Sequence, residues 1–259
     1  MADKEKVLIG ILKSAWEYAA ARPAKLHALS YAFAENDPDG FAKVVSERRS
    51  LFDGSSDQIK EMWKKSEANA LNLVPENLKD RLVAFLSKES GLDNFEKYFS
   101  SFQRPVLVHG DYRSSNLFHR RKNGKLDSLI PIDYQMFHAG TPIIDLLYFI
   151  ISGTDGDFRK YHYRQLINHY YDTFASFLKK FALDPYKLYP REHFDEDLKR
   201  TLPWGMLVVV YFLPLNLVEA EKALTLDGNA SMVNAVQSND LYRNRLLEWI
   251  RDYIEWGIM

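Results

Sequence analysis

The fold is decided by the stretch VLVHGDYRSSNLF at residues 106–118, followed by the tetrapeptide IDYQ at residues 132–135. Asp111 and Asn116 lie five positions apart in the first stretch, and Asp133 follows an apolar run in the second. Each feature alone is common, because Asp and Asn often cap turns and an Asp often ends a strand. Together, at this spacing, they instead predict a proton acceptor close to two oxygen ligands for a divalent cation.

A β-hairpin explains how these side chains would meet. Asn123-Gly124 is the favoured centre of a two-residue type I′ turn. The two expected strands span residues 116–121 and 125–132. In this register Asn116 faces Pro131 and Asp133 faces Ser114. Asn116 and Asp133 are then diagonal neighbours on one face of the hairpin, about 7–8 Å apart at the backbone.

The chemistry of the side chains suggests a role for each. Mg²⁺ prefers hard oxygen ligands, usually one or two from the protein, with phosphates and water completing the octahedron. The carboxylate of Asp133 and the amide oxygen of Asn116 suit this task, and Asp111 can accept a proton from an attacking hydroxyl. These are the parts that phosphoryl transfer from ATP requires. Asp145 lies near the start of an apolar helix, either as a helix-start charge or as a support for the catalytic loop.

The chain from about residue 105 to 150 resembles the core of the kinase-like phosphotransferases of small molecules, the aminoglycoside and choline kinase group. It is most similar to the insect ecdysteroid-kinase-like family. The segments that carry the resemblance are VLVHGD at 106–111, NLF at 116–118, IDYQ at 132–135 and PIIDLLY at 142–148. Upstream, AKLHALS at 24–30 is similar to the helix that the family carries before its catalytic loop.

The resemblance implies a role for each candidate residue. Asp111 would be the catalytic base, while Asn116 and Asp133 would hold Mg²⁺ and, through it, the nucleotide. Asp145 would support the loop around His109. The implied cofactors are ATP and Mg²⁺, and the implied acceptor is the hydroxyl of a small apolar alcohol such as an ecdysteroid.

Two features depart from the family pattern. The family often has Trp-x-Asn-Asn where this chain has RSSN at 113–116, and Arg113 adds a positive charge beside the reacting phosphate. Kinase-like enzymes also have an N-terminal β-lobe with a Gly-rich loop and a phosphate-binding Lys. This sequence contains no Gly-x-Gly, and nearly all of the chain before Asp111 is typical of helices. We therefore expect a C-terminal lobe with the N-terminal β-lobe missing, weakly active alone and able to self-associate through uncovered apolar surface.

The predicted fold class is mostly α (α+β), a protein-kinase-like C-terminal lobe around a small β-hairpin catalytic core. We expect one unit over residues 1–259, with a helical segment at 1–104, the catalytic loop and hairpin at 105–135, and a second helical segment at 136–259. The apolar pattern at 7–19 predicts a helix that bends or restarts at Pro23. Further helices are expected at 56–72, 75–89, 92–102, 143–151, 157–182, 194–226 and 239–256.

The composition of the chain excludes some kinds of binding site and argues against several cellular locations. The 259 residues include no Cys, which excludes disulfides and thiolate metal sites, and a net charge of −1 argues against broad nucleic-acid binding. The charged start lacks an apolar signal region, and the apolar run at 202–218 contains two prolines and is short for a membrane span. These features predict a cytoplasmic chain without a membrane span.

Three functions fit the sequence. The first is an ATP- and Mg²⁺-dependent transferase, a kinase that phosphorylates an apolar alcohol. The second is a non-catalytic pseudokinase that binds a ligand or a partner, and the third is a metal-assisted hydrolase that uses the same oxygens. The intact set of Asp111, Asn116 and Asp133 favours an enzyme, whereas the lack of a Gly-rich loop favours the pseudokinase.

Overall fold

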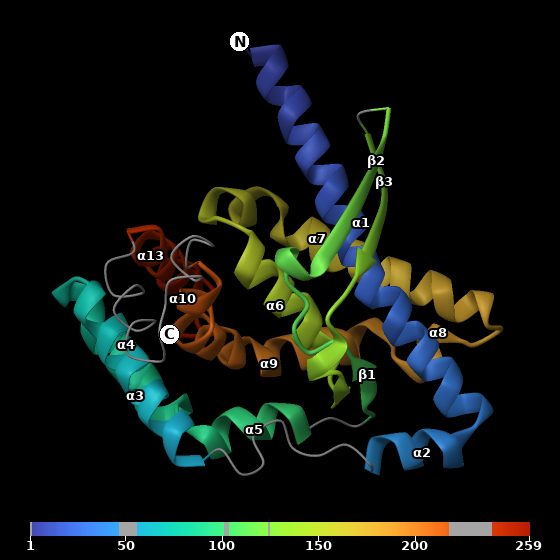
Figure 1. Ribbon diagram of the computed structural model, residues 1–259, viewed down its shortest axis with the longest axis horizontal. Helices are drawn as coiled ribbons and strands as arrows, with labels where there is room; N and C mark the ends of the chain where they lie inside the picture. The colour runs from blue at the N-terminus through green and yellow to red at the C-terminus, as the bar shows by residue number, and fades with distance from the viewer. Residues whose placement is uncertain (1, 47–55, 101–103, 124, 218–239) are drawn as a thin grey trace. The chain divides into compact units, whose positions relative to one another are not determined.

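The computed structural model describes residues 2–46, 56–100, 104–123, 125–217 and 240–259 (Figure 1). The described chain is mostly helical, with four short strands in antiparallel pairs. It divides into two compact units. The first comprises Met1–Arg49, Phe102–Gly153 and Asp157–Arg200, and the second comprises Ser50–Ser101, Thr154–Gly156 and Thr201–Met259. All the candidate site residues belong to the first unit.

Helices frame the first unit. They are α1 (Ala2–Asn36), α2 (Pro38–Ser46), α6 (Ile143–Gly153), α7 (Gly156–Lys180), α8 (Pro185–Leu188) and the first part of α9 (Arg191–Tyr211). Helix α1 runs through Pro23 as one element, so the expected restart at that residue does not occur. Ala20, Ala24 and Ala28 form a fully buried stripe on both sides of Pro23. Tertiary packing of this stripe outweighs the local cost of the proline.

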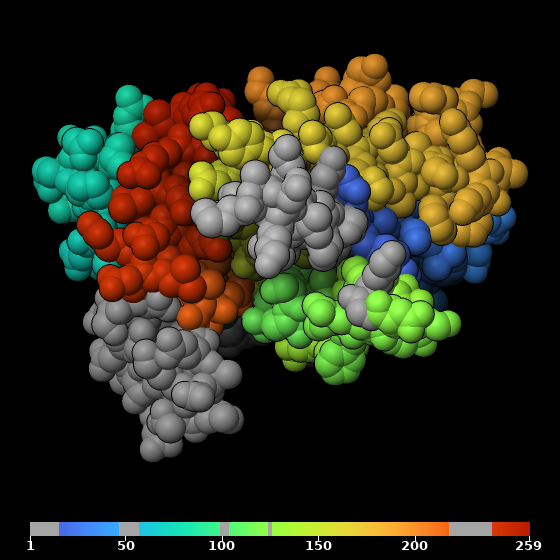
Figure 2. All heavy atoms as spheres, turned by 90° about the horizontal axis from the view of Figure 1, so that it is seen from above, coloured from blue at the N-terminus to red at the C-terminus, as the bar shows by residue number. Residues whose placement is uncertain are grey.

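Two pairs of strands lie in the first unit. Strand β1 (Val106–Val108) pairs with β4 (His138–Gly140), and β2 (Leu117–Lys122) pairs with β3 (Lys125–Pro131). The β2–β3 hairpin lies at the surface (green in Figure 2). Strand β4 was not expected, because three residues that end in glycine give no alternating pattern. It covers β1, whose three residues are all buried.

The register of the hairpin differs from the expected one. The turn is as predicted, but Leu117 rather than Asn116 faces Pro131, because the pairing shifts at Arg120 and leaves Asp127 as an extra residue. The expected pairings of Asn116 with Pro131 and of Asp133 with Ser114 are therefore wrong. Such a bulge cannot be recognised from turn chemistry alone, because the extra residue lies outside the two-residue turn.

Side chains hold the extra residue from both sides. The Nε of Arg120 donates to the Asp127 carboxylate at 2.6 Å, and the Tyr18 hydroxyl donates to the Asp127 carbonyl at 3.2 Å. Because Tyr18 belongs to α1, this contact joins the long helix to the hairpin. The bulge is thus a fixed part of the fold that sets where β3 ends.

The regular elements among the described residues of the second unit are all helices. Its helices are α3 (Ser56–Leu73), α4 (Glu76–Glu89), α5 (Leu92–Ser100), the rest of α9, α10 (Leu213–Asn216) and α13 (Asp240–Glu255). The Trp63 ring stacks on Tyr211 at 4.3 Å, and the Tyr211 hydroxyl donates to Glu67 at 2.5 Å. The expected helices at 56–72, 75–89 and 239–256 are confirmed within one residue at each end. The expected helix at 194–226 ends at Tyr211, and its last residues lie outside the described chain.

None of the helices described in either unit is both long enough and apolar enough to cross a membrane.

Candidate active site

Asp111 is held by two side chains of its own loop. The Nδ2 of Asn116 donates to the Asp111 carboxylate at 2.8 Å and to the Asp111 carbonyl at 2.9 Å. The Nε of Arg113 lies 3.2 Å from Asp111 Oδ1. Since the Asp111 side chain keeps 13% of its surface exposed, the carboxylate can still be reached from outside. The structure therefore brings together three of the residues that the sequence singled out.

Two tight backbone turns bring the side chains of Asp111, Arg113 and Asn116 together. The Arg113 N–H donates to the Asp111 carbonyl at 3.0 Å, and the Asn116 N–H donates to the Arg113 carbonyl at 2.9 Å. Ser114–Asn116 form a short 3-10 turn, not the start of a strand. The chain folds back on itself over five residues, which places the amide of Asn116 beside the carboxylate of Asp111.

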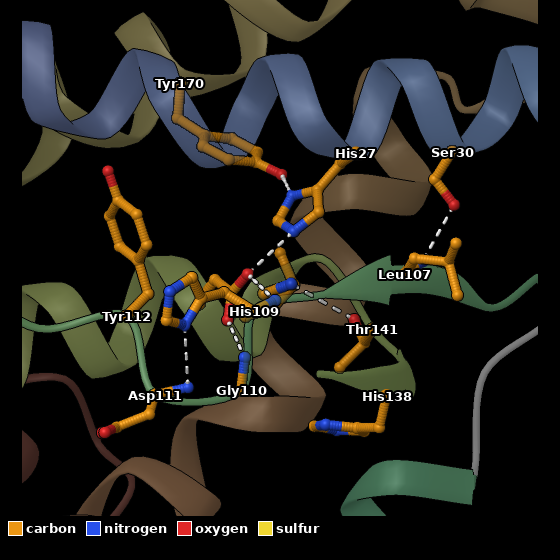
Figure 3. Close-up of polar contacts among 12 residues, drawn as sticks. His27, Ser30, Leu107, His109, Gly110, Asp111, Tyr112, His138, Thr141 and Tyr170 are labelled. Atoms are coloured by element: carbon orange, nitrogen blue, oxygen red, sulfur yellow. Dashed lines mark hydrogen bonds and ion pairs between the residues drawn. The ribbon is translucent and has the colours of Figure 1, made fainter. Parts of the chain in front are cut away.

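Asp145 anchors the backbone at the start of the loop. Its Oδ2 accepts from the His109 N–H at 2.7 Å, and its Oδ1 accepts from the Gly110 N–H at 2.9 Å. The Oδ2 also lies 3.1 Å from Nε2 of His27 on α1. Asp145 is completely buried on α6. Its three partners, His27, His109 and Gly110, are labelled in Figure 3.

The surroundings of Asp145 favour its charged form. Burial is the largest influence and would raise the pKa of the carboxyl. The hydrogen bond and charge of His27, together with the backbone N–H groups of His109 and Gly110, outweigh it and hold the pKa of Asp145 below its ordinary value. The anchor is therefore an ionised carboxylate that accepts hydrogen bonds from His27, His109 and Gly110.

His27 is itself oriented by a tyrosine from another helix. Its Nδ1 lies 2.5 Å from the hydroxyl of Tyr170 on α7 (Figure 3). Burial raises the pKa of Tyr170 well above its ordinary value, so the hydroxyl keeps its proton. Nε2 of His27 faces the Asp145 carboxylate, which only accepts, so this nitrogen carries a proton and donates it. Sequence reasoning placed His27 as a packed, hydrogen-bonded support, but it missed Tyr170, which has no local sequence signal.

The ring of His109 joins the loop that carries Asp111 to the chain that precedes Asp133. Its Nδ1 accepts from the Asp111 N–H at 3.3 Å, so Nε2 carries the proton and donates to the Ile132 carbonyl at 2.9 Å. The Ile132 N–H in turn donates to the Asn116 carbonyl at 2.9 Å. Ile132 is thus bonded to both ends of the loop, and Asp133 is the next residue.

Asp133 has an uncommon backbone conformation. Its φ is 64°, in the left-handed region, where Asp is tolerated better than most residues. The side chain is exposed, and its partner is the Gln135 Nε2 at the long distance of 3.5 Å. Gln135 contacts Oδ2, while the Oδ1 of Asp133 accepts no hydrogen bond from any described residue, so this oxygen is open to a ligand.

Gly110 is required by geometry. Its φ is 81°, and a Cβ at this position would lie 2.2 Å from the Met136 carbonyl oxygen, far inside van der Waals contact. The residue between the histidine and the aspartate of the loop must therefore be glycine. This close approach also fixes the loop against the turn that follows Asp133.

The oxygen donors suit Mg²⁺. Asn116 uses its Nδ2 on Asp111, and its Oδ1 makes no hydrogen bond to any described residue. Asp133 offers an exposed carboxylate. One amide oxygen and one carboxylate match the one or two protein ligands that Mg²⁺ takes when phosphates and water supply the rest. Within the described ranges there is no cluster of three or more His, Cys, Asp or Glu residues that could hold a metal ion.

The chain belongs to the ecdysteroid kinase-like family, whose sequence model matches residues 11–183. It is also similar to an uncharacterized kinase-like protein of Caenorhabditis elegans, at 29% identity over 107 residues. That match covers 40% of this chain but only 28% of the relative's length. The family resemblance inferred from the catalytic motif is confirmed, and the candidate site lies entirely within the matched residues.

Proposed function

We propose that this chain carries the catalytic loop of a phosphotransferase that uses ATP and Mg²⁺ to phosphorylate a hydroxyl of a small apolar alcohol, such as an ecdysteroid. One observation carries the proposal. The carboxylate of Asp111 is fixed by Asn116 and Arg113, in a loop whose backbone is bound to the buried Asp145. Precise positioning of this kind supplies most of the catalysis in phosphoryl transfer.

The proposed step gives each side chain a role. The acceptor oxygen bonds to the γ-phosphorus, the bond from that phosphorus to the β-bridging oxygen breaks, and ADP leaves with the bonding electrons. Asp111 accepts the hydroxyl proton. Arg113 lies next to Asp111, so its guanidinium can stabilise negative charge on the transferred group.

Asn116 and Asp133 are the residues that would hold Mg²⁺, which neutralises phosphate charge when bound. Asn116 orients Asp111 through its amide N–H and leaves its Oδ1 for the ion. His109 holds Asn116 and Asp133 at fixed positions relative to each other, because its ring bonds both the Asp111 N–H and the carbonyl of Ile132, the residue before Asp133.

Exposed apolar side chains near the site support an apolar acceptor. Tyr134 follows Asp133, is 45% exposed, and packs its ring 4.5 Å from that of His109. Phe118 and Ile130 face each other across the hairpin and are more than half exposed. A neutral, largely apolar alcohol fits such surroundings better than a cationic sugar.

Ligand-induced thermal stabilisation tests the proposed substrate class. The chain is melted with ATP and Mg²⁺, and then with ecdysone, choline or kanamycin added. We expect ecdysone to raise the melting temperature most and to become phosphorylated. Stabilisation by kanamycin or choline alone would contradict the proposed acceptor, while the absence of any Mg²⁺-dependent effect of ATP would contradict the nucleotide.

A second candidate function is a non-catalytic module that binds a ligand or a partner. It is favoured by one observation: every element described before β1 is a helix, and the sequence has no Gly-x-Gly to cover ATP phosphates. This function predicts apolar ligand binding that neither ATP nor Mg²⁺ changes. Asp111→Asn should then leave the affinity for that apolar ligand unaltered.

A further inference from the structure

A cavity of about 190 Å³ lies in the first unit, and none of its lining residues belongs to the catalytic loop. Its walls include Tyr31 on α1, Arg104 just before β1, Tyr189 just after α8, and Glu196, Asp197 and Arg200 on α9. We propose that this cavity is a second binding site, for a small neutral polyhydroxylated molecule of the size of one sugar or cyclitol ring.

The charges around the cavity disfavour an anion. Arg104 is already paired with Glu35, and an Arg200 nitrogen lies 2.5 Å from Asp197 Oδ1. The second carboxylate oxygen of Asp197 accepts from the Tyr189 hydroxyl at 2.8 Å. Both guanidinium groups are therefore committed to carboxylates. A phosphate or carboxylate ligand would have to compete with those partners and would also face Glu196.

The two polar side chains of the cavity that are open to a ligand, Tyr31 and Glu196, suit the hydroxyl groups of a polyol. Tyr31 is only 2% exposed, yet its hydroxyl makes no hydrogen bond to any residue in the described part of the chain. Burial raises its pKa, so the group stays a donor. Glu196 likewise has no ion pair among the described residues and is an acceptor only. A ligand hydroxyl can accept from Tyr31 while another donates to Glu196, which a neutral polyol does without bringing a charge.

The size and the remaining surface of the cavity agree with such a ligand. A cavity of roughly 150 Å³ holds a benzene molecule, so one of this size holds a six-membered ring with small substituents. The rings of Tyr31 and Tyr189 lie 5.9 Å apart and provide apolar surface for the C–H groups of the ligand. The aromatic rings contact the C–H groups of a polyol, and the polar side chains beside them form hydrogen bonds with its hydroxyls.

Isothermal titration calorimetry on the full chain tests the proposal. The probes are myo-inositol and D-glucose as neutral polyols, D-gluconate as an anion and D-glucosamine as a cation. We expect a neutral polyol to bind more tightly than either charged probe. Tyr31→Phe and Glu196→Gln should each weaken that binding about tenfold, the loss expected for one good hydrogen bond.

Two control variants test whether the loss of binding is specific to the cavity. Tyr186→Phe changes an exposed tyrosine that does not line the cavity, and Asp111→Asn changes the catalytic loop. Both should bind the polyol as the unaltered chain does. Because the Tyr31 hydroxyl has no hydrogen-bond partner among the described residues, Tyr31→Phe should also melt normally. The proposal is overturned if no neutral polyol binds, if gluconate or glucosamine binds best, or if Tyr31→Phe and Glu196→Gln bind like the unaltered chain.

Discussion

The carboxylate of Asp145 lies 3.1 Å from Nε2 of His27, although 118 residues separate the two in the sequence. The same carboxylate accepts the N–H groups of His109 and Gly110. The loop that carries Asp111 is therefore tied to α1 through one buried acid, and through His27 to Tyr170 on α7. The position of Asp111 depends on contacts that lie well outside its own loop.

Removal of this anchor should destabilise the chain strongly. In Asp145→Asn, the amide NH₂ must face either a backbone N–H or His27, so at least one buried donor loses its acceptor. We expect a loss of about 3–5 kcal/mol in the free energy of unfolding, as found when one partner of a buried charged pair is removed. Asp172→Asn, on the exposed side of α7, is the matched control and should unfold like the unaltered chain. Equal unfolding of both variants in urea would contradict the role of Asp145.

The anchor also predicts a pH dependence of stability. Because the pKa of Asp145 is lower in the folded chain than in the unfolded chain, the unfolded state binds more protons between the two values. The contribution of Asp145 is therefore complete above its ordinary pKa of 3.8 and is lost as the pH falls through the lower folded value. The stability difference between the unaltered chain and Asp145→Asn should shrink over that acid range. A difference that stays constant, or grows, on acidification would contradict the ionised anchor.

Gly110→Ala should be far more harmful than an alanine at another left-handed glycine. Gly91 has a φ of 97° and nothing within 4 Å of an added Cβ, whereas an added Cβ at Gly110 meets the Met136 carbonyl at 2.2 Å. Gly91→Ala should cost only the backbone strain, about 1–2 kcal/mol. Gly110→Ala should cost several kcal/mol or shift the loop. Similar urea midpoints for the two variants would mean that the loop does not approach Met136 so closely.

The assignment of the metal ligands predicts weak, selective binding of a divalent ion. Two protein oxygens alone bind Mg²⁺ or Mn²⁺ weakly without nucleotide phosphates. Titration with Mn²⁺, followed by water proton relaxation, should show a weak site that tightens when ATP is added. Asp133→Ala and Asn116→Ala should each abolish that site, whereas Asp172→Ala should retain it. Survival of the site in Asp133→Ala would exclude that residue as a ligand.

Much of the site could be predicted because its chemistry is local in the sequence. The spacing of Asp111, Arg113 and Asn116 determines a turn that closes on itself, and turn chemistry located the centre of the hairpin. Three expected helices, at 56–72, 75–89 and 239–256, agree with the structure within one residue at each end. These features depend on neighbours a few residues away, which the sequence displays directly.

The features that were missed depend on distant contacts. The bulge at Asp127 is held by Tyr18 on α1, and it shifts the register by one residue. The partner of His27 is Tyr170, 143 residues away. Strand β4 forms because its backbone pairs with that of β1, which lies more than 25 residues before it. Pro23 is accommodated within α1 because buried alanines pack on both sides of it. In each case tertiary contacts determine the local structure, and no pattern among neighbouring residues predicts it.

The most direct test of the proposed function is Mg²⁺-dependent transfer of the labelled γ-phosphoryl group of ATP to ecdysone by the purified chain, followed over hours. With no Gly-x-Gly in its sequence to cover the phosphates, the chain should turn over far below one event per second. The labelled steroid should nevertheless accumulate linearly, and Asp111→Asn should slow its formation by about 10²–10⁴-fold. No labelled steroid, or the same rate from Asp111→Asn, would contradict the proposal that this loop transfers a phosphoryl group.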